Sequence, residues 1–407
     1  MSTYERPAEN EFRTIEQAIW AAPPHRLAEV ANGLVGRYAN GGDAGILLID
    51  YRQAFLVPTV PGRQDVPVDN TLPGRAFASQ RIAWEPARED GGRLVHLPLS
   101  VQGERLGVLT VSLPDGGPGW LEDFAIVVAR ALKMADQGTD LFRRIRRRTR
   151  LTLAAEIQWE LLPAPSCDAA EFHFAGQLEP AYAVWGDNFD WAASEERLTL
   201  TVSNGMGSGT DAAVLTHLAI SALRNARRSG GDLVEQAALA DQTLYARHRG
   251  ERHVDTLLLD FELATGRVRA VDAGSPLIFR VRGGAAESIR FDAQMPLGMF
   301  GDTRYAVEEF TVEPGDRLVV VSDGVHAALS PSGVPFARSA LARALRATRM
   351  QEPPEAVRTM IRYFLDFHDD TEPADDAVIV CLDWTGRAAG PGADEPGRAD
   401  GPVSGGV

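Results

Sequence analysis

Apolar residues follow two different patterns in the first third of the chain. They recur at helical spacing over 15–19 and 25–38, and again over 120–134. Between these helices, continuous or alternating apolar runs predict strands at 44–50, 55–59, 94–100 and 105–113. The last two strands flank Val101-Gln102-Gly103-Glu104, which indicates a hairpin. We therefore expect a small α/β domain over 14–137, preceded by a disordered N-terminus over 1–13.

A further apolar stripe at helical spacing predicts one helix over 140–162, which Pro163 and Pro165 end. Its apolar members are Leu141, Ile145, Leu153, Ile157 and Leu161. The stripe fits a linker helix, over 138–165, that pairs with its copy in a homodimer. The arginines at 143, 144, 146, 147, 148 and 150 crowd the same segment. A basic run can bind nucleic acid or a membrane, but in this acidic chain we interpret it as a solvated helix face balanced by acidic neighbours.

The pattern over 166–384 predicts a second domain, in which strands cluster rather than alternate singly with helices. Strands are predicted at 171–178, 198–203, 254–263, 267–273, 277–281, 317–322 and 377–382. Helices are predicted at 210–228, 233–247, 337–347 and 354–368. This order indicates a mixed α+β layered fold. The segment 385–407 is rich in Gly, Pro and Ala and predicts a disordered tail.

A glycine-rich turn joins a predicted strand to a predicted helix at 203–213. Gly205, Gly207 and Gly209 would let the backbone come close to a phosphate or an ion. A dinucleotide-binding loop would need a third glycine where Thr210 stands, so we set that interpretation aside. A helix N-terminus without chemistry remains the alternative for this stretch taken alone.

Acidic residues recur at three other predicted strand ends of this domain. Asp187 and Asp190 follow the first strand in a predicted turn, Asp323 ends a very apolar strand, and Asp375-Asp376 precedes the last strand. One such Asp beside Gly is usually a turn residue. Carboxylates that converge from several strand ends are what Mg²⁺ or Mn²⁺ needs, and two such ions can activate water and hold a phosphoryl group.

The ordered set of motifs resembles the metal-dependent serine/threonine protein phosphatases (PPM, type 2C), and is most similar to their bacterial sporulation and stress-response branch. The matches are Asp187 and Asp190, residues 204–213, Ala273-Gly274-Ser275-Pro276, Pro296-Leu297-Gly298, Ser322-Asp323-Gly324 and Asp375-Asp376. The resemblance implies a β-sandwich flanked by helices on both sides. It also implies a two-metal Mn²⁺ or Mg²⁺ site, which is catalytic, formed by Asp187, Asn204, the Gly205 carbonyl, Asp323 and Asp376.

The chain departs from the family pattern at one predicted ligand. Asn204 stands where the family usually has an Asp that bridges both metals. An amide oxygen can bind one cation but carries no charge, so we expect a weakened metal pair. Trp185 replaces a frequent Gly, and Ser208 and Ser275 stand where His is frequent.

The first domain resembles GAF domains through its predicted closing hairpin, Leu97-Pro98-Leu99-Ser100-Val101 and Leu106-Gly107-Val108-Leu109. Such domains often bind small molecules, which predicts a sensor with an unknown small ligand. A ligand-free dimerisation module is the alternative, because no cluster of Cys or His residues indicates a particular ligand.

Two hypotheses of function follow. The first is a cytoplasmic phosphoserine/phosphothreonine protein phosphatase in stress-response signalling, controlled by the sensor domain. Its substrate, by resemblance, is a phosphorylated anti-anti-sigma-type regulator. The second is a degenerate phosphatase domain that regulates a partner by binding alone, which Asn204 favours.

Composition limits the partners and the cellular compartment that fit either hypothesis. The net charge of −15 argues against a nucleic-acid partner. Two cysteines without metal or redox spacing fit a reducing compartment. The acidic N-terminus does not resemble a signal peptide, and no apolar run is long enough to span a membrane.

Overall fold

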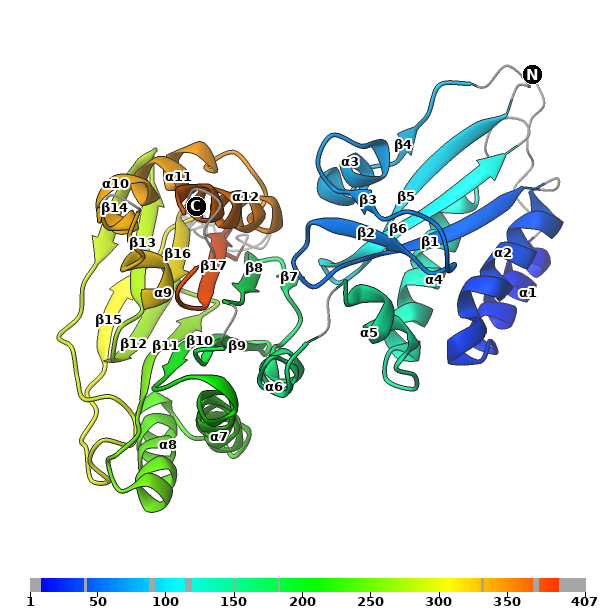
Figure 1. Ribbon diagram of the computed structural model, residues 1–407. Coiled ribbons are helices and arrows are strands. Elements are labelled where there is room, and N and C mark those ends of the chain that lie inside the picture. The colour runs from blue at the N-terminus through cyan, green and yellow to red at the C-terminus, as the bar shows by residue number, and fades with distance from the viewer. Residues whose placement is uncertain are drawn as a thin grey trace, which may run out of the picture.

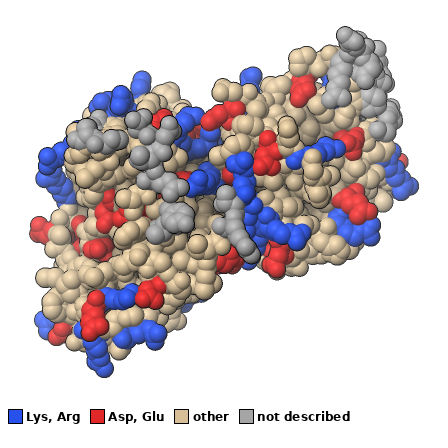
Figure 2. Space-filling view, viewed as in Figure 1, with Lys and Arg blue, Asp and Glu red and all other residues tan. Residues whose placement is uncertain are grey.

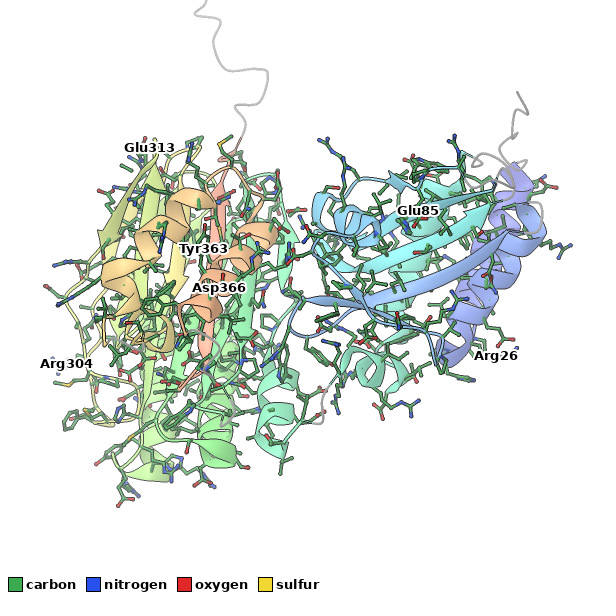
Figure 3. All side chains as sticks on the ribbon, turned by 45° about the horizontal axis from the view of Figure 1, so that its top comes forward. Arg26, Glu85, Arg304, Glu313, Tyr363 and Asp366 are labelled. Carbon is green, nitrogen blue, oxygen red and sulfur yellow. The ribbon has the colours of Figure 1, made fainter. Side chains whose placement is uncertain are left out.

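The computed structural model describes residues 9–39, 42–87, 92–113, 119–148, 151–181, 184–330, 333–368 and 373–387. It forms two domains side by side, the first blue to cyan and the second green to red (Figure 1). In Figure 3, Arg26 and Glu85 lie in the first domain and Arg304 and Glu313 in the second. In the described part of the chain, no helix combines the length and apolarity needed to cross a membrane.

The predicted disordered termini are only partly described. Residues 1–8 and 388–407 lie outside the described residues. For residues 9–13 the prediction is wrong, because they belong to helix α1 (Glu9–Trp20), and Phe12 and Ile15 pack into the first domain's core. At the other end, the backbone N–H groups of Thr385 and Gly386 donate to the Glu171 carbonyl, so the fold continues a little past residue 384.

The first domain is built on one antiparallel sheet. Its strand order is β3-β2-β1-β6-β5-β4. The strands are β1 (Asp43–Ile49), β2 (Phe55–Pro58), β3 (Val66–Pro67), β4 (Ala83–Trp84), β5 (Arg93–Val101) and β6 (Glu104–Leu113). The predicted hairpin between β5 and β6 is confirmed, with Gln102 and Gly103 both at positive φ in its turn. The short β3 and β4 were not predicted, because two-residue strands carry no periodicity.

Helices cover both faces of this sheet. Helices α1, α2 (Leu27–Tyr38) and α4 (Leu121–Ala135) bury one face, where Ile15, Val35 and Phe124 are fully enclosed. A shorter helix, α3 (Leu72–Ser79), covers part of the other face. The α/β fold of this domain is as predicted, and its likeness to GAF domains stays a prediction.

The predicted linker helix over 140–162 is wrong. It is two helices, α5 (Leu141–Arg146) and α6 (Leu153–Leu161), because Arg147 leaves the helical conformation at φ −87° and ψ 99°. Leu141 packs on the core of the first domain, whereas Leu161 packs on that of the second. The apolar stripe is therefore divided between the two domains of one chain, and the homodimer remains a prediction without its continuous helix.

The second domain is a sandwich of two antiparallel sheets between layers of helices (Figure 1). One sheet has the order β15-β12-β11-β10-β9, from β9 (Asp187–Ala193), β10 (Arg197–Gly205), β11 (Val254–Glu262), β12 (Arg267–Ala273) and β15 (Glu308–Thr311). The other has the order β14-β13-β16-β17-β8-β7, from β7 (Ser166–Asp168), β8 (Phe172–Glu179), β13 (Leu277–Arg282), β14 (Ala285–Ile289), β16 (Arg317–Val321) and β17 (Ala377–Trp384). This confirms the predicted layered α+β fold.

Each layer buries its own apolar surface. Phe174, Leu200 and Leu259 belong to the core between the two sheets. Helices α7 (Gly209–Arg228) and α8 (Leu233–His248) cover the outer face of the first sheet. The other outer face carries α10 (Phe336–Ser339), α11 (Leu341–Ala347) and α12 (Pro353–Phe367), so the helix predicted over 337–347 is in fact interrupted at Ala340.

The two domains touch through backbone and charged contacts. The Ser166 hydroxyl donates to the Gly103 carbonyl at 2.9 Å, at the tip of the first domain's hairpin. On the neighbouring surface, Arg358 and Arg362 of α12 form ion pairs with Asp69 at 2.7 and 2.9 Å. These contacts fix how the first domain approaches the second.

Candidate active site

Asp187, like Asp376, is fully buried among the predicted site residues. It begins β9 rather than lying in a turn, so the predicted turn over 185–190 is wrong from residue 187 onward. Its side chain has no exposed surface, and neither oxygen has a well-directed hydrogen bond among the described residues, although the Ser322 hydroxyl lies near enough to lower the pKa of Asp187. Burial raises the pKa of Asp187 well above its usual range, and Asp323, Asp376 and Asp375 raise it further by repulsion.

Asp323 faces the predicted amide ligand. It lies directly after β16 at the first position of the short helix α9 (Asp323–His326). Its Oδ1 accepts a hydrogen bond from Asn204 Nδ2 at 2.5 Å and another from the Gly324 N–H at 2.9 Å. Asn204 therefore presents its donor, rather than its oxygen, to Asp323.

Asp376 is placed as a structural anchor. It is fully buried, and its Oδ2 accepts from Gln158 Nε2 at 2.7 Å and from the N–H groups of Trp185 and Gly186 at 2.7 and 3.1 Å. Its Oδ1 accepts from the Ala181 N–H at 3.0 Å. These donors use most of the acceptor capacity of a carboxylate. Asp376 thus holds the segment before β9 and helix α6 in place.

The neighbouring Asp375 was not among the residues chosen from the sequence. Burial, together with repulsion from Asp323 and Asp376, raises the pKa of Asp375 to about 7. The Asp-Asp pair marked the location, but which of the two carboxylates faces Asp323 depends on the donors that surround them. Asp375 is therefore the carboxylate of the pair that lies near other acidic groups and accepts fewer hydrogen bonds.

A second residue missed by the sequence interpretation is Asp255. It lies on β11 opposite Asn204 in the sheet register. Burial and repulsion from Asp323 and Asp272 raise the pKa of Asp255 to about 6. An acidic residue at the start of a long apolar strand was the only signal in the sequence.

Asp190, the second acidic residue of the first motif, is not part of this cluster. It is 2% exposed and forms ion pairs with Arg224 and Arg227 of α7 at 2.8 and 3.0 Å. Arg224 also donates to the Leu161 carbonyl of α6 at 2.7 Å. Asp190 therefore ties β9 to the helices on its outer face.

The glycines of the motifs allow close backbone packing. A Cβ at Gly205 would lie 2.1 Å from Thr216 Oγ1, and one at Gly324 would lie 1.8 Å from the Asp376 carbonyl oxygen. Gly207 and Gly209 have φ of +102° and +69°, which favour glycine. The predicted glycine-rich turn between a strand and a helix is confirmed, because β10 ends at Gly205 and α7 begins at Gly209.

The donor chemistry fits a hard divalent cation, although the ligands are not gathered. Oxygen ligands of this kind suit Mg²⁺ and Mn²⁺, and the unpartnered Asp187 carboxylate is the kind of group that a cation satisfies. Within the described ranges, however, no three Asp, Glu, His or Cys side chains converge closely enough to hold a metal. Asn204 also turns its amide nitrogen, rather than its oxygen, towards Asp323, which is not the orientation of a metal ligand.

Residues 194–385 match the family described as stage II sporulation protein E (SpoIIE). This match makes the second domain similar to the SpoIIE-type phosphatases, the class that the sequence motifs predicted.

Relatives of this class share low identity with the chain. Protein IcfG of Synechocystis sp. is 22% identical over 228 residues, which are 49% of this chain and 36% of that protein, so the chain spans about a third of that relative. The RsbU and RsbW domains of Rv1364c from Mycobacterium tuberculosis are 21% identical, with 54% and 61% of the two chains covered and a TM-score of 0.46. The phosphatase domain of SpoIIE from Bacillus subtilis, with a fragment of its regulatory domain, is 14% identical, with 77% and 85% covered and a TM-score of 0.48.

Proposed function

We propose that the second domain is a metal-dependent phosphoserine/phosphothreonine protein phosphatase that acts on a regulatory protein. The observation that carries this proposal is the fully buried, unpartnered carboxylate of Asp187 beside Asp323 and Asp375. Burying an unpaired carboxylate is unfavourable, so such a cluster is expected where a cation compensates it. A substrate of the anti-anti-sigma type follows only from the family resemblance.

Asp187, Asp323 and Asp375 would hold the Mn²⁺ or Mg²⁺ ions. Asn204 would add its amide oxygen after a rotation of the side chain, and Gly205 its carbonyl. The ions would supply the positive charge that draws together the substrate phosphate and an activated water. Asp376 acts by position, because it fixes the backbone that leads into Asp187.

Control by the first domain has a physical route through α6. Gln158 of α6 donates from one Nε2 to Asp376 Oδ2 at 2.7 Å and to the Asp187 carbonyl at 2.9 Å. Glu156 and Glu160 of the same helix form ion pairs with Arg147 and Arg143, on the side of the first domain. Displacement of α6 would therefore disturb the acidic cluster.

The test compares Asp187→Asn with Asp302→Asn, a matched change at an exposed Asp of the second domain. We expect wild-type protein and the Asp302 variant to bind Mn²⁺ in calorimetry and to hydrolyse p-nitrophenyl phosphate only when metal is present. The Asp187 variant should lose both. Full activity in excess chelator, or unchanged Mn²⁺ binding by Asp187→Asn, would contradict the proposal.

The second candidate function is partner binding without catalysis. The hydrogen bond from Asn204 Nδ2 to Asp323 Oδ1 favours it, since that bond stabilises Asp323 without any metal. Wild-type protein that binds no Mn²⁺, and stays inactive towards phosphoproteins, would support this alternative.

A further inference from the structure

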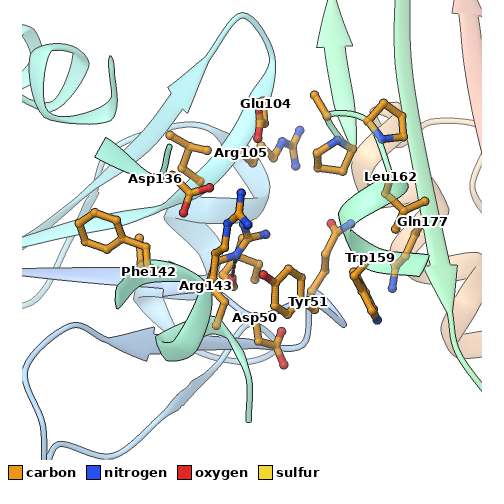
Figure 4. Close-up of a pocket in the computed structure, with 18 of the residues that line it drawn as sticks. Asp50, Tyr51, Glu104, Arg105, Asp136, Phe142, Arg143, Trp159, Leu162 and Gln177 are labelled. Carbon is orange, nitrogen blue, oxygen red and sulfur yellow. Dashed lines mark hydrogen bonds between the residues drawn. The ribbon is translucent and has the colours of Figure 1, made fainter. Parts of the chain in front are cut away.

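A cavity of about 230 Å³ lies between the two domains (Figure 4), and the residues that line it do not include Asp187, Asp323 or Asp375. The first domain contributes Tyr51, Asp136 and Arg143 to its walls, and the second contributes Gln177 on β8. Trp159 of α6 lines the same space. A volume of this size has room for roughly eight waters, which suits a compound of one or two rings.

Several polar atoms in the cavity walls lack partners. Among the described residues, Arg147 Nε, Trp159 Nε1, Asp136 Oδ1 and Gln177 Oε1 are buried and accept or donate no hydrogen bond. Leaving such an atom buried without a hydrogen bond is unfavourable. The four side chains line the cavity, but these atoms have almost no accessible surface, so a bound molecule would pair with them after small rotations of the side chains.

Aromatic side chains form part of the wall. The rings of Tyr51 and Trp159 lie 4.7 Å apart between centroids, inclined by 51°. Phe142 lines the cavity from α5. Arg146 stacks over the Tyr51 ring at 4.7 Å. These surfaces favour a planar, apolar body in the ligand.

Two cations of the cavity, Arg146 and Arg143, are held loosely or lack a carboxylate partner. Arg146 donates to the Ile49 carbonyl at 2.9 Å, and no ion pair to a carboxylate is found for it in the described ranges. Arg143 pairs with Glu160, but these two side chains are 36% and 46% exposed. Exposed pairs of this kind contribute little, so an anion entering the cavity can compete for Arg143. On the face shown in Figure 2, blue surface gathers along the boundary between the domains.

Acidic residues also line the cavity and limit the charge of its occupant. Asp50 accepts hydrogen bonds from the Ala54 and Phe55 N–H groups, and burial raises its pKa. Glu104 is paired with Lys133 at 2.6 Å. With these carboxylates occupied, a single anionic group on the ligand faces Arg143 and Arg146.

We propose that this interdomain cavity binds a small planar aromatic compound that carries one carboxylate or phosphate. The site stands apart from the proposed phosphatase activity, because it depends on the domain interface and not on the acidic cluster. Arg146 and Arg143 would bind the anionic group, and Tyr51 and Trp159 would pack against the ring. Gln177 and Asp136 would accept hydrogen bonds from the donors of the ligand.

The test is calorimetric titration of the full chain with three probes: indole-3-acetate, benzoate and uridine monophosphate. We expect saturable binding of at least one, with carboxylate and phosphate distinguished by which probe binds. Arg146→Gln should weaken that binding at least tenfold, whereas Arg144→Gln, an exposed arginine outside the cavity, should leave it unchanged.

Arg143→Gln serves as a second variant should Arg146→Gln fail to fold, and it is also expected to weaken binding. No saturable binding of any probe would overturn the proposal. Equal binding of inorganic phosphate and the three probes would overturn the aromatic part of the site. Binding that Arg144→Gln weakens as much as Arg146→Gln does would show general attraction to a basic surface, and would also overturn it.

Discussion

Replacement of Asn204 by Asp offers the sharpest test of how the acidic cluster works. In the structure, Asn204 Nδ2 donates to Asp323 Oδ1. Asn204→Asp removes a hydrogen bond to a charged group, worth about 1.5–3 kcal/mol. It also brings two carboxylates together, and two unit charges about 3 Å apart repel by roughly 5 kcal/mol at an effective dielectric constant near 20.

Protonation limits the size of this penalty. Holding one proton at pH 7 on a group whose ordinary pKa is near 4 costs about 4 kcal/mol. We therefore expect Asn204→Asp to lower the free energy of unfolding by about 4 kcal/mol in excess chelator. In Mn²⁺ the sign should reverse, because a carboxylate can bridge two cations and an amide offers one oxygen.

The assay is urea unfolding at pH 7, in chelator and in saturating MnCl₂, with a phosphatase assay beside it. Asn225→Asp on the exposed face of α7 is the matched control, and it should change stability little in either condition. Because Asn204 precedes Gly205, mass spectrometry must confirm that fresh protein is not deamidated. Equal stability, equal Mn²⁺ stabilisation and equal turnover of wild type and Asn204→Asp would refute the reasoning.

Three further changes probe the contacts around the site. Gln158→Leu should speed amide exchange at Trp185 in metal-free protein, measured by hydrogen–deuterium exchange, and unchanged exchange would contradict the anchoring role of α6. Burial raises the pKa of Glu179 to about 7, so the folded state retains a proton that the unfolded chain loses and stability falls as pH rises from about 4.5 to 7. Glu179→Gln should remove up to about 3 kcal/mol of that fall in urea melts, and an unaltered pH profile would count against it. Asp190→Asn should lower the free energy of unfolding by about 3–5 kcal/mol, since two arginines lose their buried partner, and a loss below 1 kcal/mol would disagree.

The structure separates two neighbouring carboxylates that look equivalent in the sequence. Asp375 and Asp376 precede the same strand, and the motif alone favoured Asp376 as the ligand. Asp376 instead accepts N–H groups from residues 181–186, almost two hundred positions earlier in the chain. No local pattern records such donors, so the choice between the two carboxylates needed the folded chain.

The linker shows the same limit for helices. Leu141 to Leu161 has helical spacing, and each half is indeed helical. Spacing records which residues share a side, but not what that side packs against. Here the two halves pack on different domains, and the chain bends at Arg147 to let them do so.

Periodicity and turn residues act over a few positions, so the sequence predicted most of the longer helices and strands, the layered α+β class and the strand ends where acidic residues gather. The likeness to PP2C phosphatases also came from short motifs in order, and the match over 194–385 bears it out. Tertiary structure alone decided that Asp187 is buried without a partner, that Asn204 donates to Asp323, and that Asp255 and Asp375 face the cluster. It also formed the interdomain cavity. These features arise where distant strands and two domains meet, and burial and repulsion there depend on neighbours that the local sequence does not specify.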